Sequence, residues 1–125
     1  MVIGMGVDVV DINRFRTALA RTPGMRERIF TPAELVLVAA KADSVPSLAA
    51  RFAAREAVMK ALGLGLGAFG FHDVSVWVDE ASAPHLVVEG RAKELADERG
   101  VAAWHVSLAH DGGVSIATVI AEGTA

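Results

Sequence analysis

The chain has 125 residues, of which 53% are hydrophobic and 22% charged, and its formal net charge is −3. This length and composition predict a single domain, residues 1–125, with enough apolar side chains for a packed core, and they exclude intrinsic disorder. The lack of cysteine excludes a disulfide framework, while the acidic balance and short apolar runs argue against a nucleic-acid binder and a membrane span. We therefore expect a soluble, cytoplasmic protein.

Residues 2–10 alternate in character, which predicts the first strand. Asp8 would share one face with Gly4 and Gly6, where the missing side chains would let a ligand or another chain approach closely. The opposite face would carry only apolar side chains: Ile3, Met5, Val7 and Val9. Because an unpaired carboxylate is costly to bury, Asp8 needs a cation, solvent or backbone hydrogen bonds beside it.

Capping signals predict three helices in the first half of the chain. Their expected ranges are 12–21, with Asp11 as the N-cap; 32–41, opened by a capping box of Thr31 and Glu34; and 48–62, ended by Gly63. In the second half, strands are expected at 71–78, 85–89, 103–108 and 114–121, and one helix at 91–99. Helices early and strands late predict the α+β class with a mostly antiparallel sheet.

The helix over 48–62 carries several charged residues. Glu56 and Lys60 lie one turn apart on one line, and Arg51 and Arg55 occupy the adjoining line. Glu56 and Lys60 could form only a surface ion pair of small energetic value. The alternative is a site for a metal-bound pyrophosphate, in which the acid holds the metal and the cations hold phosphate oxygens.

The last predicted strands carry two histidines, His105 and His110. They are five positions apart, so they do not share a face while the strand continues, and a metal site built on this pair is not expected. Each is either a hydrogen-bonded structural residue or a ligand contact.

The segment from Arg14 to Arg28 holds five arginines and one acid. These arginines form either a solvated helix face or a docking surface for an acidic partner. Arg14, Arg21 and Arg28 recur every seven residues, and we expect them to line one edge close to Asp8.

Three segments resemble, in order, the motifs of one family: Gly6–Val10, Arg51–Ala61 and His105–His110. Together they resemble the holo-[acyl-carrier-protein] synthase family of the phosphopantetheinyl transferase superfamily, and the likeness extends over essentially the whole chain. The resemblance implies the 4′-phosphopantetheinyl transferase fold and a homotrimer with its sites between protomers.

The resemblance also implies a reaction. In this reaction, 4′-phosphopantetheine moves from coenzyme A to a serine of apo-acyl carrier protein with the help of Mg²⁺, which releases 3′,5′-ADP and supports fatty-acid biosynthesis. Asp8 and Glu56 would bind Mg²⁺ together with coenzyme A phosphates. The serine would lose its proton to Glu56 or to a metal-bound water, and Lys60 would stabilise or protonate the departing 3′,5′-ADP.

The resemblance implies coenzyme A contacts at Arg51, Lys60, His105, His110 and Pro84. Carrier proteins of this family are acidic, so the charge and spacing of Arg14, Arg21 and Arg28 make these three the expected carrier-protein contacts.

The chain departs from the family pattern at three places. Arg55 stands where lysine is usual, Ala109 stands where serine or threonine is usual, and Ser82-Ala83 replaces a glycine and a basic residue before Pro84. These departures affect the expected nucleotide contacts rather than the metal site.

Two other functions are weighed against the transferase: a catalytically idle module that binds coenzyme A or a carrier protein, and a magnesium-dependent nucleotide hydrolase.

Overall fold

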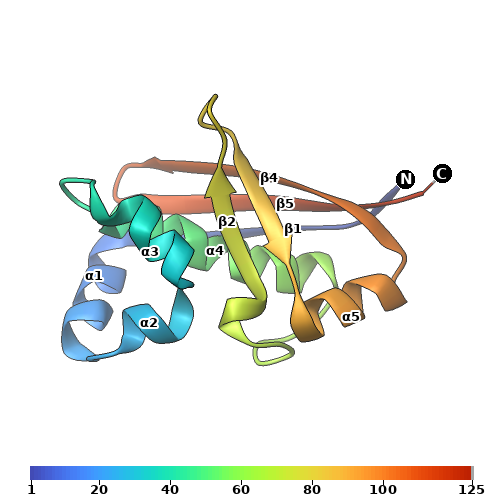
Figure 1. The fold of residues 1–125 in the computed structure, drawn as a ribbon, viewed down its shortest axis with the longest axis horizontal. Helices are drawn as coiled ribbons and strands as arrows, with labels where there is room; N and C mark the ends of the chain where they lie inside the picture. Colours follow the sequence, from blue (N-terminus) through green and yellow to red (C-terminus); the bar gives the residue numbers. More distant parts are fainter. Residues whose placement is uncertain (125) are drawn as a thin grey trace.

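The computed structural model describes residues 1–124 and has the predicted α+β architecture (Figure 1). The helices are α1 (Ile12–Arg21), α2 (Met25–Ile29), α3 (Pro32–Ala39), α4 (Val45–Ala61) and α5 (Gly90–Glu98), with a 3-10 turn η1 (Phe71–Asp73). The strands are β1 (Val2–Asp11), β2 (Val74–Val78), β3 (Pro84–Val88), β4 (Val101–Asp111) and β5 (Val114–Gly123).

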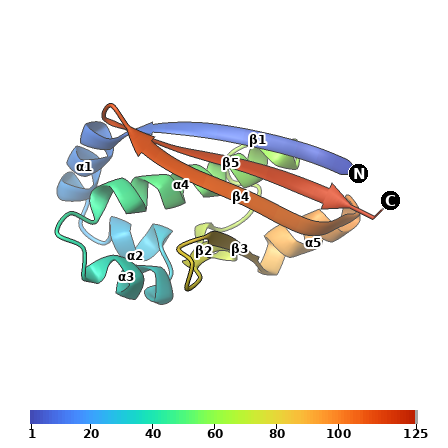
Figure 2. The same ribbon diagram turned by 90° about the horizontal axis from the view of Figure 1, so that it is seen from above.

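The strands form two antiparallel sheets, one in the order β1-β5-β4 and a smaller hairpin of β2 and β3. The long helix α4 packs along one face of the three-stranded sheet, with α1, α2 and α3 at one end of the molecule and α5 at the other (Figures 1 and 2). One hydrophobic core lies between α4, the sheet, the hairpin and α5, and a second lies between α1, α2, α3 and the first turns of α4. Because α4 supplies side chains to both cores, its position is fixed along its whole length.

The predicted N-terminal caps of α1 and α3 are confirmed. The Asp11 side chain accepts a hydrogen bond from the Arg14 backbone N–H at 2.9 Å, and Thr31 and Glu34 form the complete capping box. In contrast, α4 begins at Val45, three residues earlier than predicted, because the Asp43 carboxylate accepts the Val45 N–H at 3.1 Å.

One local prediction is wrong, and one short helix was missed. The strand expected at 71–78 begins only at Val74, since residues 71–73 form the turn η1. The carboxylate of Asp73 closes that turn by accepting the backbone N–H groups of Gly70 and Ala92, each at 3.3 Å. The short helix α2 was not predicted, because its five residues follow Pro23 and Gly24 without a side-chain cap.

The two faces of β1 are as predicted, and their surroundings differ. The glycine face lies against α4: a Cβ on Gly6 would be 2.1 Å from the carbonyl oxygen of Ala57, and one on Gly4 would be 1.9 Å from that of Ala61. The close approach that these glycines permit is therefore made by a helix of the same chain. The apolar face is open, with exposures of 38% at Ile3 and 64% at Met5.

No helix within residues 1–124 combines the length and the apolar character that crossing a membrane requires.

Candidate functional site

The close packing of β1 on α4 brings together three charged residues that the sequence predicted as catalytic: Asp8, Glu56 and Lys60. The Lys60 ammonium donates to Asp8 Oδ1 at 3.2 Å and to the carbonyl oxygen of Val7 at 2.9 Å. Lys60 thus supplies the cation that Asp8 needs. The alternative of a simple Glu56–Lys60 surface pair is wrong, because Lys60 pairs with the strand instead.

Glu56 lacks a comparable partner. Its Oε1 atom is buried and has no hydrogen-bond partner within residues 1–124. Burial raises the pKa of Glu56, the negative charge of Asp8 raises it further, and Lys60 opposes both effects. These are the properties of a carboxylate that is short of one positive charge, and a cation beside Asp8 would supply it.

Asp8 and Glu56 open into a cleft of about 470 Å³. Its other lining residues come mainly from the end of β1 and from α1, with one each from α4 and the loop after it: Val9, Val10, Asp11, Arg14, Phe15, Ala18, Phe52 and Leu66. A second groove shares Arg14 and Ala18 with this cleft and continues along α1 to Arg21. The structure thus joins Arg14 and Arg21 to the carboxylates through one continuous surface.

Arg28 differs from the other two arginines of the series. It is exposed on α2, outside the residues that line this surface. The sequence spacing could not show this, because Pro23 and Gly24 redirect the chain between α1 and α2.

Two arginines of α4 point away from Glu56. Arg55 is fully buried and holds both carboxylate oxygens of Glu34, donating from Nη1 to Oε2 at 3.1 Å and from Nη2 to Oε1. Its Nε donates to the carbonyl oxygen of Phe71 at 2.8 Å. Glu34 was predicted only as part of a helix cap. Its burial has no clear local signal, because the partner Arg55 is 21 residues away and two of the apolar residues after Glu34, Val36 and Leu37, are exposed.

Arg51 lies beside this pair and lines a separate pocket of about 420 Å³. The pocket also contains His110 and Pro84, two other predicted coenzyme A contacts, together with Lys41, which the sequence analysis missed. The Arg51 side chain is only 6% exposed, its Nη1 reaches the carbonyl oxygen of Ser47 at 3.4 Å, and its Nε has no hydrogen-bond partner within residues 1–124.

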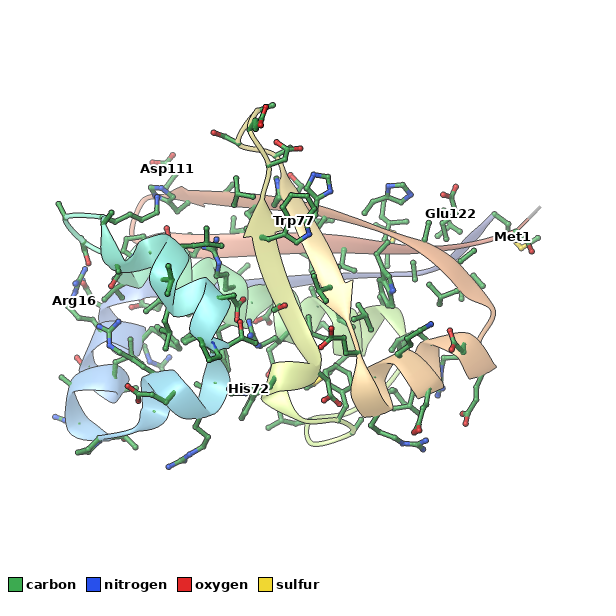
Figure 3. The ribbon with its side chains drawn as sticks, in the orientation of Figure 1. Met1, Arg16, His72, Trp77, Asp111 and Glu122 are labelled. Atoms are coloured by element: carbon green, nitrogen blue, oxygen red, sulfur yellow. The ribbon has the colours of Figure 1, made fainter. Side chains whose placement is uncertain are left out.

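His105 belongs to neither pocket. It pairs in register with Ile120, on the face of the sheet that carries Met5, whereas Asp8 pairs with Ala117 on the face toward α4. Its Nε2 lies 3.0 Å from Oε1 of Glu122, which Figure 3 shows near Met1 at the end of the sheet away from α1. Within one chain the predicted site residues therefore fall into three groups rather than one.

Comparisons with known proteins identify the family of this chain. Residues 4–119 match the family model described as the 4′-phosphopantetheinyl transferase superfamily. A holo-[acyl-carrier-protein] synthase of Streptomyces avermitilis is 50% identical over 122 residues, and the match covers 98% of each chain. One of an Arthrobacter species is 48% identical, with 98% of this chain and all of that one covered.

Two solved structures share the fold. The holo-[acyl-carrier-protein] synthase of Neisseria meningitidis has a TM-score of 0.88 and 30% identity, over 98% of this chain and 99% of that one. The Helicobacter pylori synthase in complex with coenzyme A has a TM-score of 0.79 and 31% identity, over 94% and 99% of the two chains. With the family model and near full-length relatives in agreement, the chain belongs to the holo-[acyl-carrier-protein] synthase family of the 4′-phosphopantetheinyl transferase superfamily.

Proposed function

We propose that this chain transfers 4′-phosphopantetheine from coenzyme A to a serine of an apo-acyl carrier protein and releases 3′,5′-ADP. The observation that carries the proposal is the pair of Asp8 and Glu56, with one unpartnered buried oxygen, at the end of an arginine-lined groove. The relatives are named for this activity, and the Helicobacter pylori structure contains coenzyme A. The other product, holo-acyl carrier protein, serves fatty-acid biosynthesis.

The residues present fit a magnesium ion. Two carboxylates from β1 and α4 face one cleft, and Mg²⁺ in proteins typically takes one or two carboxylates and completes its shell with substrate phosphates and water. The buried Oε1 of Glu56, which has no hydrogen-bond partner within residues 1–124, is an oxygen that such an ion could use as a ligand. When bound, the ion would neutralise charge on the pyrophosphate of coenzyme A. Asp8 and Glu56 would hold it.

The chain's own groups account for the proton and the leaving group. The serine O–H gives its proton to Glu56, and the serine oxygen forms a bond to the β-phosphorus. The bond from that phosphorus to the bridging oxygen of 3′,5′-ADP then breaks, and the electron pair leaves with the oxygen. Lys60, held by Asp8 and the Val7 carbonyl, is positioned to stabilise the departing negative charge.

The pocket around Arg51 would take the nucleotide end of coenzyme A. Arg51, Lys41 and His110 line it, and these are groups that bind phosphate. A buried guanidinium with an unpartnered donor favours an anionic ligand, because desolvating a charge without a partner is costly. Pro84 would form part of the opposite wall.

Self-association would bring the three groups of residues together. The open face of the three-stranded sheet carries Ile3, Met5, Val7 and Val9, with exposures between 38% and 64%. An apolar face of this kind typically marks a protein interface. We propose that it is buried in a homotrimer, in which His105 of one protomer reaches the Asp8–Glu56 cleft of the next. Each protomer, residues 1–125, would act as one domain.

The groove along α1 would receive the carrier protein. Arg14 and Arg21 line it and lead toward the two carboxylates, so an acidic carrier bound there could present its serine to them. Arg28, exposed on α2, lies outside this groove and is not part of the proposed contact. The cytoplasmic location predicted from the sequence would give the enzyme access to coenzyme A.

Mass spectrometry of an apo-acyl carrier protein tests the function directly. Incubation with this protein, coenzyme A and Mg²⁺ should add one phosphopantetheine group to the carrier and release 3′,5′-ADP, and chelation of the metal should abolish both. Binding without a mass change would indicate an inactive binding module. Consumption of coenzyme A without modification of the carrier would indicate a hydrolase.

A further inference from the structure

Glu34 lies at the centre of a buried hydrogen-bond network. Its Oε1 accepts from the backbone N–H of Thr31 at 3.0 Å, from the Thr31 hydroxyl at 3.3 Å and from Arg55 Nη2. Its Oε2 accepts from the Val76 N–H at 3.0 Å and from Arg55 Nη1 at 3.1 Å. A carboxylate offers about four lone-pair sites, so these donors fill both oxygens.

Arg51 is consequently left outside the network. Its Nε lies 4.0 Å from Oε2 of Glu34, beyond hydrogen-bond distance, and has no other partner within residues 1–124. The two arginines and Glu34 together carry a formal charge of +1 in the interior. Because Arg55 takes both oxygens of Glu34, Arg51 has only an ion-pair contact with that carboxylate and no hydrogen bond to it, and Arg51 is the arginine that lines the pocket.

We propose that Arg55 is a positioning residue: by occupying both oxygens of Glu34, it leaves the Arg51 guanidinium free to bind a phosphate group of the nucleotide. This inference rests on the proposed function, since it concerns the pocket assigned to the nucleotide end of coenzyme A. It assigns to Arg55, one residue before Glu56, a role that involves no contact with the substrate.

The shape of the arginine side chain is essential to this role. Its planar fork spans both Glu34 oxygens while Nε reaches the carbonyl oxygen of Phe71. A lysine ammonium is a single donor centre and would release one carboxylate oxygen. Oε2, already only 4.0 Å from Arg51 Nε, would then accept a hydrogen bond from Arg51 and compete with the phosphate.

Isothermal titration calorimetry with 3′,5′-ADP tests the proposal on the full-length protein. Arg55→Lys should bind 3′,5′-ADP about tenfold more weakly than the natural protein, the factor expected for losing roughly one charge-assisted hydrogen bond. In steady-state assays, the KM for coenzyme A should rise while kcat and the KM for carrier protein stay the same.

A double-mutant cycle separates positioning from general damage. In an Arg51→Met background, Arg55→Lys should have almost no further effect on 3′,5′-ADP affinity, because the residue through which it acts is gone. An equal loss in both backgrounds would overturn the proposal, as would unchanged affinity of the single variant. If the natural protein binds neither coenzyme A nor 3′,5′-ADP, the proposed function itself fails.

Glu34→Gln provides a second test that does not depend on Arg55→Lys. It removes the negative charge that lies 4.0 Å from Arg51 Nε and keeps one carbonyl oxygen as an acceptor. Circular dichroism would first verify that Glu34→Gln is folded. This variant should bind 3′,5′-ADP at least about threefold more tightly than the natural protein, because the negative charge of Glu34 no longer repels the negatively charged phosphates. Unchanged or weaker binding would contradict the proposal.

Discussion

Two charged clusters that form where other elements pack against α4 differ in burial and in the sign of their net charge. Asp8, Glu56 and Lys60 carry a formal charge of −1 beside an open cleft, and the side chains of Asp8 and Lys60 are 20% and 55% exposed. The second cluster, the buried residues Glu34, Arg51 and Arg55, carries +1.

The difference indicates what each cluster binds. A carboxylate cluster with an unpartnered oxygen favours a cation, and an arginine cluster with an unpartnered nitrogen favours an anion. A metal-bound pyrophosphate with a further phosphate on its nucleotide offers both. The first cluster is partly exposed, so substitutions there should change activity more than stability.

The largest expected effect is that of Glu56→Gln, which removes the charge of the first cluster at nearly constant volume. Product formation should fall by about 100-fold or more, the range for losing one acid–base or electrostatic group. The melting temperature should not fall, because the substitution relieves a buried uncompensated charge.

Rates of carrier modification at saturating Mg²⁺ measure this effect. Glu94→Gln, on the exposed surface of α5, is the matched control and should keep full activity. Near-normal turnover of Glu56→Gln would remove Glu56 from the metal site.

Gly6→Ala attacks the geometry that creates the first cluster. Its Cβ would lie 2.1 Å from the carbonyl oxygen of Ala57, so β1 and α4 must separate, at a cost of about 1–3 kcal/mol or more. Thermal unfolding should show a melting temperature lower by roughly 5 °C or more. Gly65→Ala is the control, because a Cβ there meets nothing within 4 Å. Equal melting temperatures for the two variants would refute the close packing.

The arginine groove predicts a smaller effect that is confined to one substrate. Arg14→Glu or Arg21→Glu should raise the KM for carrier protein by roughly three- to tenfold and reduce its salt dependence, since rim charges act mainly on encounter and are screened by salt. The KM for coenzyme A should stay the same. Arg91→Glu, exposed on α5, provides the control. Equal shifts in both KM values would rule out a docking surface.

The smallest effect is expected at a balanced pair, Arg16 and Asp43, which needs no ligand. Arg16 lowers the pKa of Asp43 to about 2 from 3.8, chiefly through their hydrogen bond. A lowered pKa means that the pair's stabilisation is complete above pH 4 and is lost as the pH falls toward 2.

The variant Asp43→Asn should therefore melt slightly lower than the natural protein at pH 7, and the gap should close between about pH 4 and pH 2. Arg16→Gln should show the same trend with a smaller pH dependence, because the Asp43 carboxylate still accepts the Val45 N–H in that variant. A gap that stays constant with pH would mean that the pair contributes nothing through its charge.

The sequence predicted much of the fold and the family, and both are confirmed. Asp11, Thr31 and Glu34 carry local capping signals, and these depend only on neighbouring residues. The same holds for the alternation in β1, whose two faces were predicted correctly.

The parts that were missed depend on distant segments. Arg55 was read as a neighbour of Glu56, but its partner Glu34 is 21 residues away and comes from another helix. Arg28 shares the spacing of Arg14 and Arg21, but the turn before α2 moves it off their groove. Neither outcome follows from periodicity, because both depend on how the helices pack.

The central claim is that one site combines residues of neighbouring protomers, with Asp8 from one and His105 from the next. Asp8→Ala and His105→Ala proteins should each be nearly inactive alone, while unfolding them together and refolding the mixture should restore activity. In randomly mixed rings, about a quarter of the sites would combine an intact Asp8 with an intact His105. Carrier modification by the whole refolded mixture, in which native mass spectrometry verifies mixed assemblies, should therefore recover to about that fraction. No recovery in verified mixed assemblies would contradict a shared site.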